Sequence, residues 1–95
     1  MNERAKYSAV ISVIGRDQVG IIAKVTAILA EVNVNVSDLS QTILQDVFTM
    51  IMLVDLSGLT VDFETLSQRL RTLGTSMHLE IQIQHKDIFN AMQRI

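Results

Sequence analysis

Cysteine, proline and tryptophan are absent from the 95 residues of this chain. Without cysteine the chain has no disulfides, no thiolate metal ligands and no cysteine nucleophile. Acidic residues outnumber lysine and arginine by ten to eight, and no window is rich in basic residues. Nucleic-acid-binding domains generally carry a basic stripe, so this pattern argues against a nucleic-acid partner.

Long apolar runs are also missing, because none approaches the ~20 residues that a membrane span needs. The start of the sequence, residues 1–4, is polar and mixed in charge, which does not resemble a secretory signal. We therefore expect a cytoplasmic protein with no membrane partner.

Apolar residues, in contrast, are plentiful: they make up 48% of the chain, against 19% charged residues. A chain of this length has room for one domain with one hydrophobic core, so residues 1–95 are predicted to form a single domain. Such a small domain has a large surface for its volume, so its core cannot hold all of these apolar residues. The excess has to be shielded from water in another way. A subunit interface is the usual place, which predicts a homodimer.

Four segments have the composition of β-strands. Residues 7–14 and 77–84 carry apolar residues at every second position, which is typical of a strand with one buried and one wet face. Residues 34–44 and 47–55 predict two more strands, with Gln45-Asp46 at the turn between them.

Two segments have the helical period instead. The first, Gly20–Val32, places six apolar residues on one stripe. The second, Asp62–Leu73, does the same, with Asp62 as the predicted N-cap and Gly74 as the left-handed residue that ends the helix. A short terminal piece, Asp87–Ile95, has apolar residues at helical spacing and needs something to dock on.

The predicted order is β-α-β-β-α-β plus a C-terminal helix. This is the ferredoxin-like split βαβ arrangement of the α+β class: a four-stranded antiparallel sheet with two helices on one face. The core spans about residues 6–85 and the terminal helix about residues 86–95. Strand 47–55 is apolar on both faces, so one set of side chains points away from the helices. That set is covered by the terminal helix or forms a subunit interface, and both can hold together.

Enzyme chemistry finds little support in the sequence. His78 and His85 are seven residues apart, which puts them on opposite faces of a continuous strand, and the acidic residues are scattered. We expect no metal, no cofactor and no catalytic activity. A sheet of this order also binds RNA in other proteins, but that function needs exposed aromatic residues, which make up only 4% of this chain.

The loop between the first strand and first helix, Gly15–Ile22, is the most informative stretch. Two glycines bracket polar residues just before a helix N-terminus, whose free N–H groups and positive dipole suit an anion. Lysine and a hydroxyl residue do not follow Gly20, so this is not a phosphate loop. Asp17 is a candidate acceptor for an ammonium group and Arg16 a candidate partner for a carboxylate. The alternatives are an Asp17 that caps or charge-complements the helix start and a solvated Arg16.

The run from Val10 to Ile22, followed by Val34-Asn35-Val36, Asp38 and Gln41, resembles an ACT domain over nearly the whole chain. The end, from Gln84 to Ile95, resembles an uncharacterised bacterial family of stand-alone ACT proteins. The resemblance implies a dimeric regulatory domain that binds an effector, commonly an amino acid, at the subunit interface. Together, loop and resemblance nominate these ligand-binding residues: Arg16, Asp17, Val19, Gly20, Ile21, Ile22, Asn33, Asn35 and Val36.

One departure is Val19, where many members of that family have proline. Two hypotheses follow for the function. In the first, the chain is a free-standing amino-acid sensor that acts in trans on a partner enzyme or regulator. In the second, it is a dimeric interaction module without a ligand, and the open sheet face around Phe48, Met50 and Met52 binds a partner protein.

Overall fold

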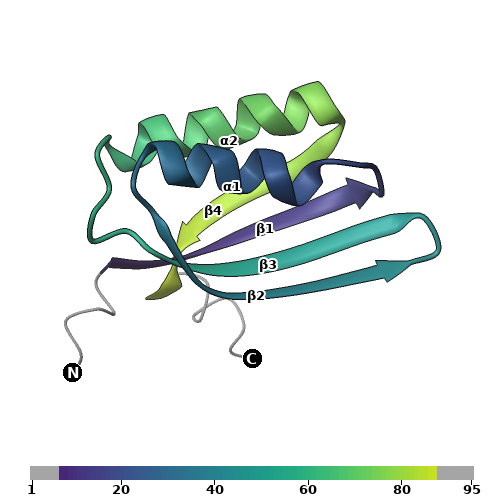
Figure 1. The fold of residues 1–95 in the computed structure, drawn as a ribbon, viewed down its shortest axis with the longest axis horizontal. Helices are drawn as coiled ribbons and strands as arrows, with labels where there is room; N and C mark the ends of the chain where they lie inside the picture. Colours follow the sequence, from purple (N-terminus) through teal and green to yellow (C-terminus); the bar gives the residue numbers. More distant parts are fainter. Residues whose placement is uncertain (1–6, 88–95) are drawn as a thin grey trace.

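The computed structural model of this chain describes residues 7–87. Its elements run in the order β1 (Ser8–Arg16), α1 (Ile21–Glu31), β2 (Asn35–Leu44), β3 (Val47–Asp55), α2 (Phe63–Met77) and β4 (Leu79–His85). The strands form one sheet in the order β2-β3-β1-β4, and each neighbouring pair is antiparallel (Figure 1). The predicted ferredoxin-like fold is confirmed.

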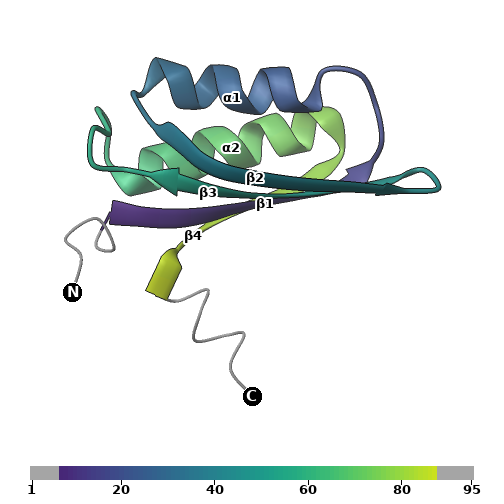
Figure 2. The same cartoon turned by 60° about the horizontal axis from the view of Figure 1, so that its bottom comes forward.

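Both helices cover the same face of the sheet, as predicted (Figure 2). The period of two along each strand explains this, because it sends one set of apolar side chains under the helices. That set is buried and comes from β1, β3 and β4: Ala9, Ile11, Val13, Phe48, Met50, Met52, Val54, Leu79, Ile81 and Ile83. The helices close the core with buried residues such as Val25 of α1 and Leu70 of α2. Neither helix is long and apolar enough to cross a membrane.

The first strand is longer than predicted, because it continues through Gly15 to Arg16. Gly15 pairs with Phe48 on one side and Leu79 on the other. A Cβ at Gly15 would lie 2.6 Å from the side chain of Leu79 and 3.1 Å from the carbonyl oxygen of His78. This glycine therefore allows β4 to approach closely and does not belong to the loop.

The second helix also extends beyond its predicted end. It starts as predicted, with the Asp62 side chain accepting from the N–H of Thr65 at 2.8 Å. However, it passes through Gly74 to Met77, and His78 takes the left-handed conformation with φ of 58°. The predictions of Gly74 as the helix end, and of His78 as a strand residue, are therefore wrong. Gly74 is buried against β4, where a Cβ would lie 2.6 Å from the carbonyl oxygen of Leu79.

The hairpin between β2 and β3 turns at Gln45-Asp46, as predicted, and Gln45 takes a left-handed φ of 59°. β2 lies at one edge of the sheet and β4 at the other. The pairing of β2 with β3 shifts register between Val36 and Asp38, which marks a bulge in the edge strand.

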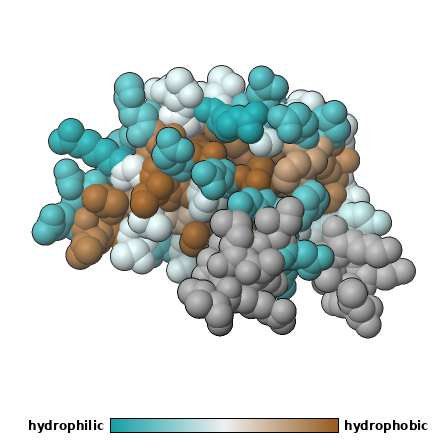
Figure 3. Space-filling view, turned by 180° about the vertical axis from the view of Figure 1, so that it is seen from behind, coloured by the Kyte–Doolittle hydropathy of each residue, from teal (hydrophilic) through white to brown (hydrophobic). Residues whose placement is uncertain are grey.

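The sheet face turned away from the helices, called here the outer face, is partly apolar. Val47 and Ile51 of β3 and Ile14 of β1 are exposed there. The prediction that Phe48, Met50 and Met52 form the open face is wrong, because these three side chains point to the helices and are buried in the core. The view from behind shows apolar surface interspersed with hydrophilic residues on this side (Figure 3). The predicted terminal helix falls mainly on residues 88–95, which lie outside the described part of the chain.

Candidate functional site

The loop from β1 to α1 is tied to two distant parts of the chain. The backbone N–H of Asp17 donates to the carbonyl of Asp46, in the β2–β3 turn, at 2.8 Å. The side-chain amide of Gln18 donates to the carbonyl of Met77 at 3.0 Å, near the end of α2. Gly20 then takes a left-handed φ of 95° and begins α1. The loop is short, and its position is set by the hairpin turn and by α2.

Beside this loop lies a hollow of about 300 Å³, called here the loop hollow. Its inner wall includes Ile21 and Phe48, which are buried, and its rim includes the exposed Gln41 and Ile43 of β2. The full lining comes from the loop, the first turn of α1 and the β2–β3 hairpin: Asp17, Gln18, Gly20, Ile21, Ile22, Ala23, Gln41, Ile43 and Phe48. A small ligand here would meet an apolar wall and a polar rim.

The helix start at this hollow has no cap of its own. Gly20 has no side chain to accept from the first-turn N–H groups, and the first turn of α1 carries no acidic residue. At the start of α2, in contrast, Asp62 caps and Glu64 adds a negative charge. The dipole of α1 therefore meets no negative side chain at N-cap or in the first turn, which leaves it free to attract an anion.

Asp17 does not cap the helix, so the capping alternative is wrong: the N-cap residue is Gly20. Its side chain is exposed, and within residues 7–87 no hydrogen bond or ion pair engages the carboxylate. The loop hollow therefore presents N–H donors at one side and a carboxylate at another. That pairing of charges complements a zwitterion.

Four of the nominated residues line this hollow: Asp17, Gly20, Ile21 and Ile22. Arg16 and Val19 do not. Arg16 is the last residue of β1 and pairs in register with Val47 of the outer face. Val19 is 98% exposed at the tip of the loop.

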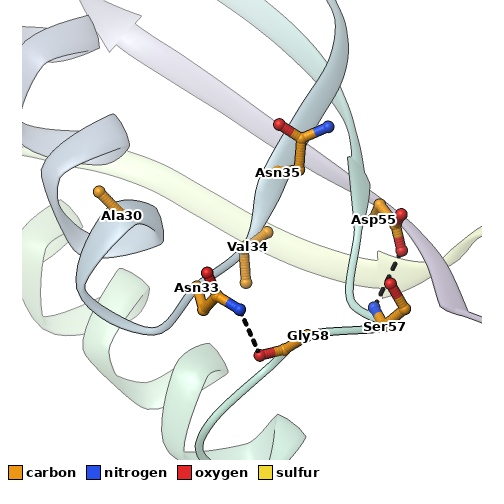
Figure 4. A pocket seen from close by; sticks show the side chains of 7 residues that line it. All are labelled: Ala30, Asn33, Val34, Asn35, Asp55, Ser57 and Gly58. Carbon is orange, nitrogen blue, oxygen red and sulfur yellow. Dashed lines mark hydrogen bonds between the residues drawn. The ribbon is translucent and has the colours of Figure 1, made fainter.

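The nominated asparagines lie at the other end of α1. Asn33 and Asn35 line a second hollow of about 420 Å³, called here the asparagine hollow, together with Ala30, Val34, Asp55, Ser57 and Gly58 (Figure 4). An 11-residue helix, about 16 Å long, separates the two hollows. Within one chain, the nominated residues therefore form two groups. Val36 lines neither hollow and is half-buried.

Contacts inside the asparagine hollow hold its own walls together. Asn33 takes a left-handed φ of 62°, and its side-chain amide donates to the carbonyl of Gly58 at 3.1 Å. The N–H of Ser57 donates to the carboxylate of Asp55 at 2.9 Å. Figure 4 shows the bond from Asn33 joining the turn after α1 to the segment after β3, and the bond from Ser57 tying that segment back to the end of β3.

Residues on β2 and β3 complete the loop hollow, and the loop motif alone does not reveal them. Gln41 was marked by the resemblance, but Ile43 and Phe48 were not predicted as site residues. Metal ligation is not supported, because residues 7–87 contain no group of three His, Asp or Glu side chains able to hold an ion. His85 stacks on the ring of Phe63, with 4.3 Å between the ring centroids.

Comparison with known proteins decides the family. The sequence model described as ACT domain matches residues 8–84. This chain belongs to the ACT domain family. ACT domains are regulatory domains that typically bind small-molecule effectors and oligomerise.

Relatives of this ACT domain include single-domain proteins. The UPF0237 protein of Methanocaldococcus jannaschii is 49% identical over 86 residues, which cover 90% of this chain and 96% of the relative. The C-terminal segment resembles a bacterial family of stand-alone ACT proteins, and this relative shows that similar proteins also occur in archaea.

Solved protein structures share this fold. An ACT domain protein from Streptococcus pneumoniae has 38% identity and a TM-score of 0.74, covering 86% of this chain and 92% of that protein. The regulatory subunit of aspartate kinase from Thermus thermophilus, in ligand-free form, has 25% identity and a TM-score of 0.64. That match covers 83% of this chain and 51% of the subunit.

Proposed function

We propose that this chain is an amino-acid-binding regulatory domain that works as a homodimer and acts in trans on a partner enzyme or regulator. The observation that carries the proposal is the loop hollow, where an uncapped helix start and the Asp17 carboxylate flank an apolar wall. We infer a cytoplasmic location, where free amino acids and the enzymes that use them are found.

The proposed ligand pose follows from charge. The α-carboxylate accepts from the N–H groups at Gly20–Ile22, and the ammonium group contacts Asp17. A helix dipole contributes only about 0.3–1 kcal/mol, whereas a Kd between about 1 mM and 10 µM needs roughly 4–7 kcal/mol. Hydrogen bonds to the charged groups of the ligand add about 1.5–3 kcal/mol each. The apolar wall at Ile21 and Phe48 adds about 1.5–3 kcal/mol more when it buries one aliphatic side chain. This favours an amino acid with an apolar side chain.

Dimer formation through β2 would close the hollow. β2 is an edge strand, and on its helix side Leu39 and Ile43 are 37% and 51% exposed. Ile43 and the exposed Ala23 of α1 line the rim of the hollow together. A second copy on this edge would bury these apolar groups and pair the backbone N–H and C=O groups that an edge strand leaves unpaired.

Asn33 and Asn35 were nominated as ligand-binding residues but lie outside the loop hollow of their own chain, and a second copy could supply them. The loop hollow and the asparagine hollow lie at opposite ends of α1, so one chain does not bring them together. Antiparallel pairing of two β2 strands sets the end of one strand beside the start of the other. Asn33 and Asn35 of the second copy are then candidates to approach the loop hollow.

The alternative function is an interaction module without a ligand. The outer face favours it, because Ile14 and Val47 are 48% and 45% exposed and Ile51 lies beside them in the sheet. A sensor needs the loop hollow, whereas an interaction module needs only this face. Ligand binding therefore separates the two functions.

The test is thermal unfolding of the purified protein against each of the twenty amino acids at millimolar concentration. A ligand at a hundredfold excess over Kd adds about 2.7 kcal/mol, and about 1 kcal/mol moves the midpoint of a domain of this size by roughly 4–8 °C. We expect a selective rise for one or a few amino acids with apolar side chains. A flat panel would contradict the sensor function and favour the interaction module.

A matched pair of variants tests the pose. Asp17→Ala removes the proposed ammonium partner and should weaken binding at least tenfold without lowering the unfolding midpoint. Glu80→Gln removes another exposed carboxylate, on the opposite edge of the sheet, and should leave binding unchanged. Equal affinity of Asp17→Ala and Glu80→Gln for the ligand would refute the role of Asp17.

A further inference from the structure

The far edge of the sheet carries a groove that the ligand proposal does not use. β4 pairs with β1 on one side, and within residues 7–87 no strand pairs with its other side. α2 runs above β4 (Figure 1). Between them lie two hollows of about 290 and 240 Å³, which share Arg71, Ile81 and Gln82. We call this continuous feature the edge groove.

The edge groove has an apolar floor and a polar wall. Leu79, Ile81 and Ile83 of β4 lie almost fully buried along the floor. Ser67, Arg71 and Thr75 of α2 form the wall, one helical turn apart from each other. An unpaired strand edge beside such a wall is the arrangement to which extended peptides add as a further strand.

The spacing of the wall matches that of an added strand. Four residues of a helix rise about 6 Å, and two residues of a strand rise about 6.6 Å. Successive inward side chains of a peptide along β4 would therefore meet Ser67, Arg71 and Thr75 in turn. The intervening side chains would extend the outer face beside Gln82.

Two charged residues line the edge groove, Arg71 and Glu80. Glu80 pairs in register with Ile14 and so belongs to the outer face, which leaves Arg71 as the charge on the helix side. Its guanidinium donates to the Ser67 hydroxyl at 3.0 Å and to the Glu64 carboxylate at 3.2 Å. The Arg71–Glu64 pair is exposed on both sides, and an exposed ion pair of this kind is weak, so a ligand carboxylate is able to replace Glu64. Arg71 therefore selects an acidic side chain at the centre of the groove.

A second copy of this chain does not fit the groove. Two β4 strands paired about their centres would bring two Arg71 side chains together, because Arg71 lies beside Ile81 and Gln82 at the middle of β4. The inward residues of β2, Leu39, Gln41 and Ile43, offer no carboxylate. Neither pairing gives Arg71 a carboxylate, which favours a segment of another protein that carries one.

We propose that the edge groove binds an extended peptide segment of a partner protein, with an acidic side chain on Arg71 and small polar side chains two residues to either side. A domain that acts in trans needs a surface that contacts its partner, and the edge groove would be that surface. It is independent of the ligand in the loop hollow.

The probe is a fluorescein-labelled, amidated peptide of sequence Thr-Ser-Val-Glu-Val-Ser-Thr, compared with the same peptide carrying lysine at its centre. Fluorescence anisotropy with the full chain should give a Kd at or below about 1 mM for the glutamate peptide, at least tenfold tighter than for the lysine peptide. Backbone amide shifts in NMR spectra should concentrate in β4 and α2.

Variants of two neighbouring arginines supply the control. Arg71→Glu should reverse the preference of the two peptides. Arg69→Gln lies on the same helix but pairs with Glu31 outside the groove, and should leave the preference unchanged. Binding without charge preference, shifts confined to β2, or no binding of either peptide would each overturn the proposal. A change in the oligomeric state of Arg71→Glu would also overturn it, in favour of a second copy.

Discussion

A Cβ atom on Gly74 would lie 2.6 Å from the carbonyl oxygen of Leu79, nearer than side chains approach backbone oxygens. This contact sets how closely α2 packs on β4. It also explains why a helix-breaking residue stands inside a 15-residue helix.

Gly74→Ala should therefore destabilise the domain, although alanine favours helices by about 1 kcal/mol. Overpacking typically costs about 1–3 kcal/mol, and here the obstacle is backbone. We expect a net loss of about 1–2 kcal/mol, which is a fall in midpoint of roughly 4–16 °C by thermal unfolding. Thr72→Ala, at an exposed position of the same helix, should have little effect. Equal midpoints for the two variants would contradict the close packing.

Asn33 combines a left-handed backbone with a side-chain hydrogen bond, and two variants separate these roles. Asn33→Gly keeps the backbone conformation but loses the bond to Gly58, which costs about 0.5–1.5 kcal/mol. Asn33→Ala loses the bond and adds about 1–2 kcal/mol of backbone strain. Urea unfolding should rank stability as wild type, then Asn33→Gly, then Asn33→Ala. If alanine is as stable as glycine, the left-handed conformation is not required.

The N-cap of α2 predicts a dependence of stability on pH. Hydrogen bonds from Thr65, first from its side chain and then from its backbone N–H, lower the pKa of Asp62 below 3.8. The folded state therefore favours the carboxylate. Its contribution is fully present well above pH 3.8, the value taken for the unfolded chain, and is lost as the pH falls through the lower folded pKa.

Asp62→Asn isolates this effect, because asparagine still caps a helix but does not titrate. The difference in unfolding free energy between wild type and Asp62→Asn should be constant from about pH 7 to pH 5 and change below about pH 4, with the wild type losing stability. Urea unfolding at each pH measures it. A difference that stays constant down to about pH 2.5 would show that the cap does not depend on ionisation.

The proposed dimer through β2 is tested by two charge insertions. Ile43→Lys places a cation on the exposed edge, and Ile14→Lys places one on the outer face. Sedimentation velocity should show a dimer for wild type and Ile14→Lys, and a monomer for Ile43→Lys, because lysine on an edge strand opposes pairing. The reverse result would move the interface to the outer face.

Local patterns in the sequence predicted most of the fold. The alternation of residues 77–84 and the stripe of residues 20–32 follow burial directly. Asp62 marks the start of α2, and Gln45-Asp46 marks the turn between β2 and β3. Gly15 and Gly74 were misplaced because both serve contacts with β4, which lies far from them in sequence or on another element. The sequence alone does not distinguish a glycine required for a positive φ from a glycine required for close packing against a neighbouring element.

The candidate site was predicted only in part, for the same reason. The loop and helix start are contiguous in sequence, so Asp17, Gly20, Ile21 and Ile22 were found together. Phe48 and Ile43 come to the loop hollow through the hairpin, whose turn is joined to the loop by the bond from Asp17 to Asp46. Asn33 and Asn35 were grouped with the loop, but the length of α1 separates them.

The two open edges of the sheet differ in what repeated association through them would produce. Pairing β2 with β2 is self-complementary about a two-fold axis, so it stops at two chains, whereas pairing β2 with β4 would continue without limit as a fibre. The open-ended arrangement is opposed at Arg71, because the inward residues of β2 offer it no carboxylate. A closed pair would carry one edge groove at each end of its joined sheet. A partner with two acidic segments, spaced to reach both ends, would then bind far more tightly than either segment alone.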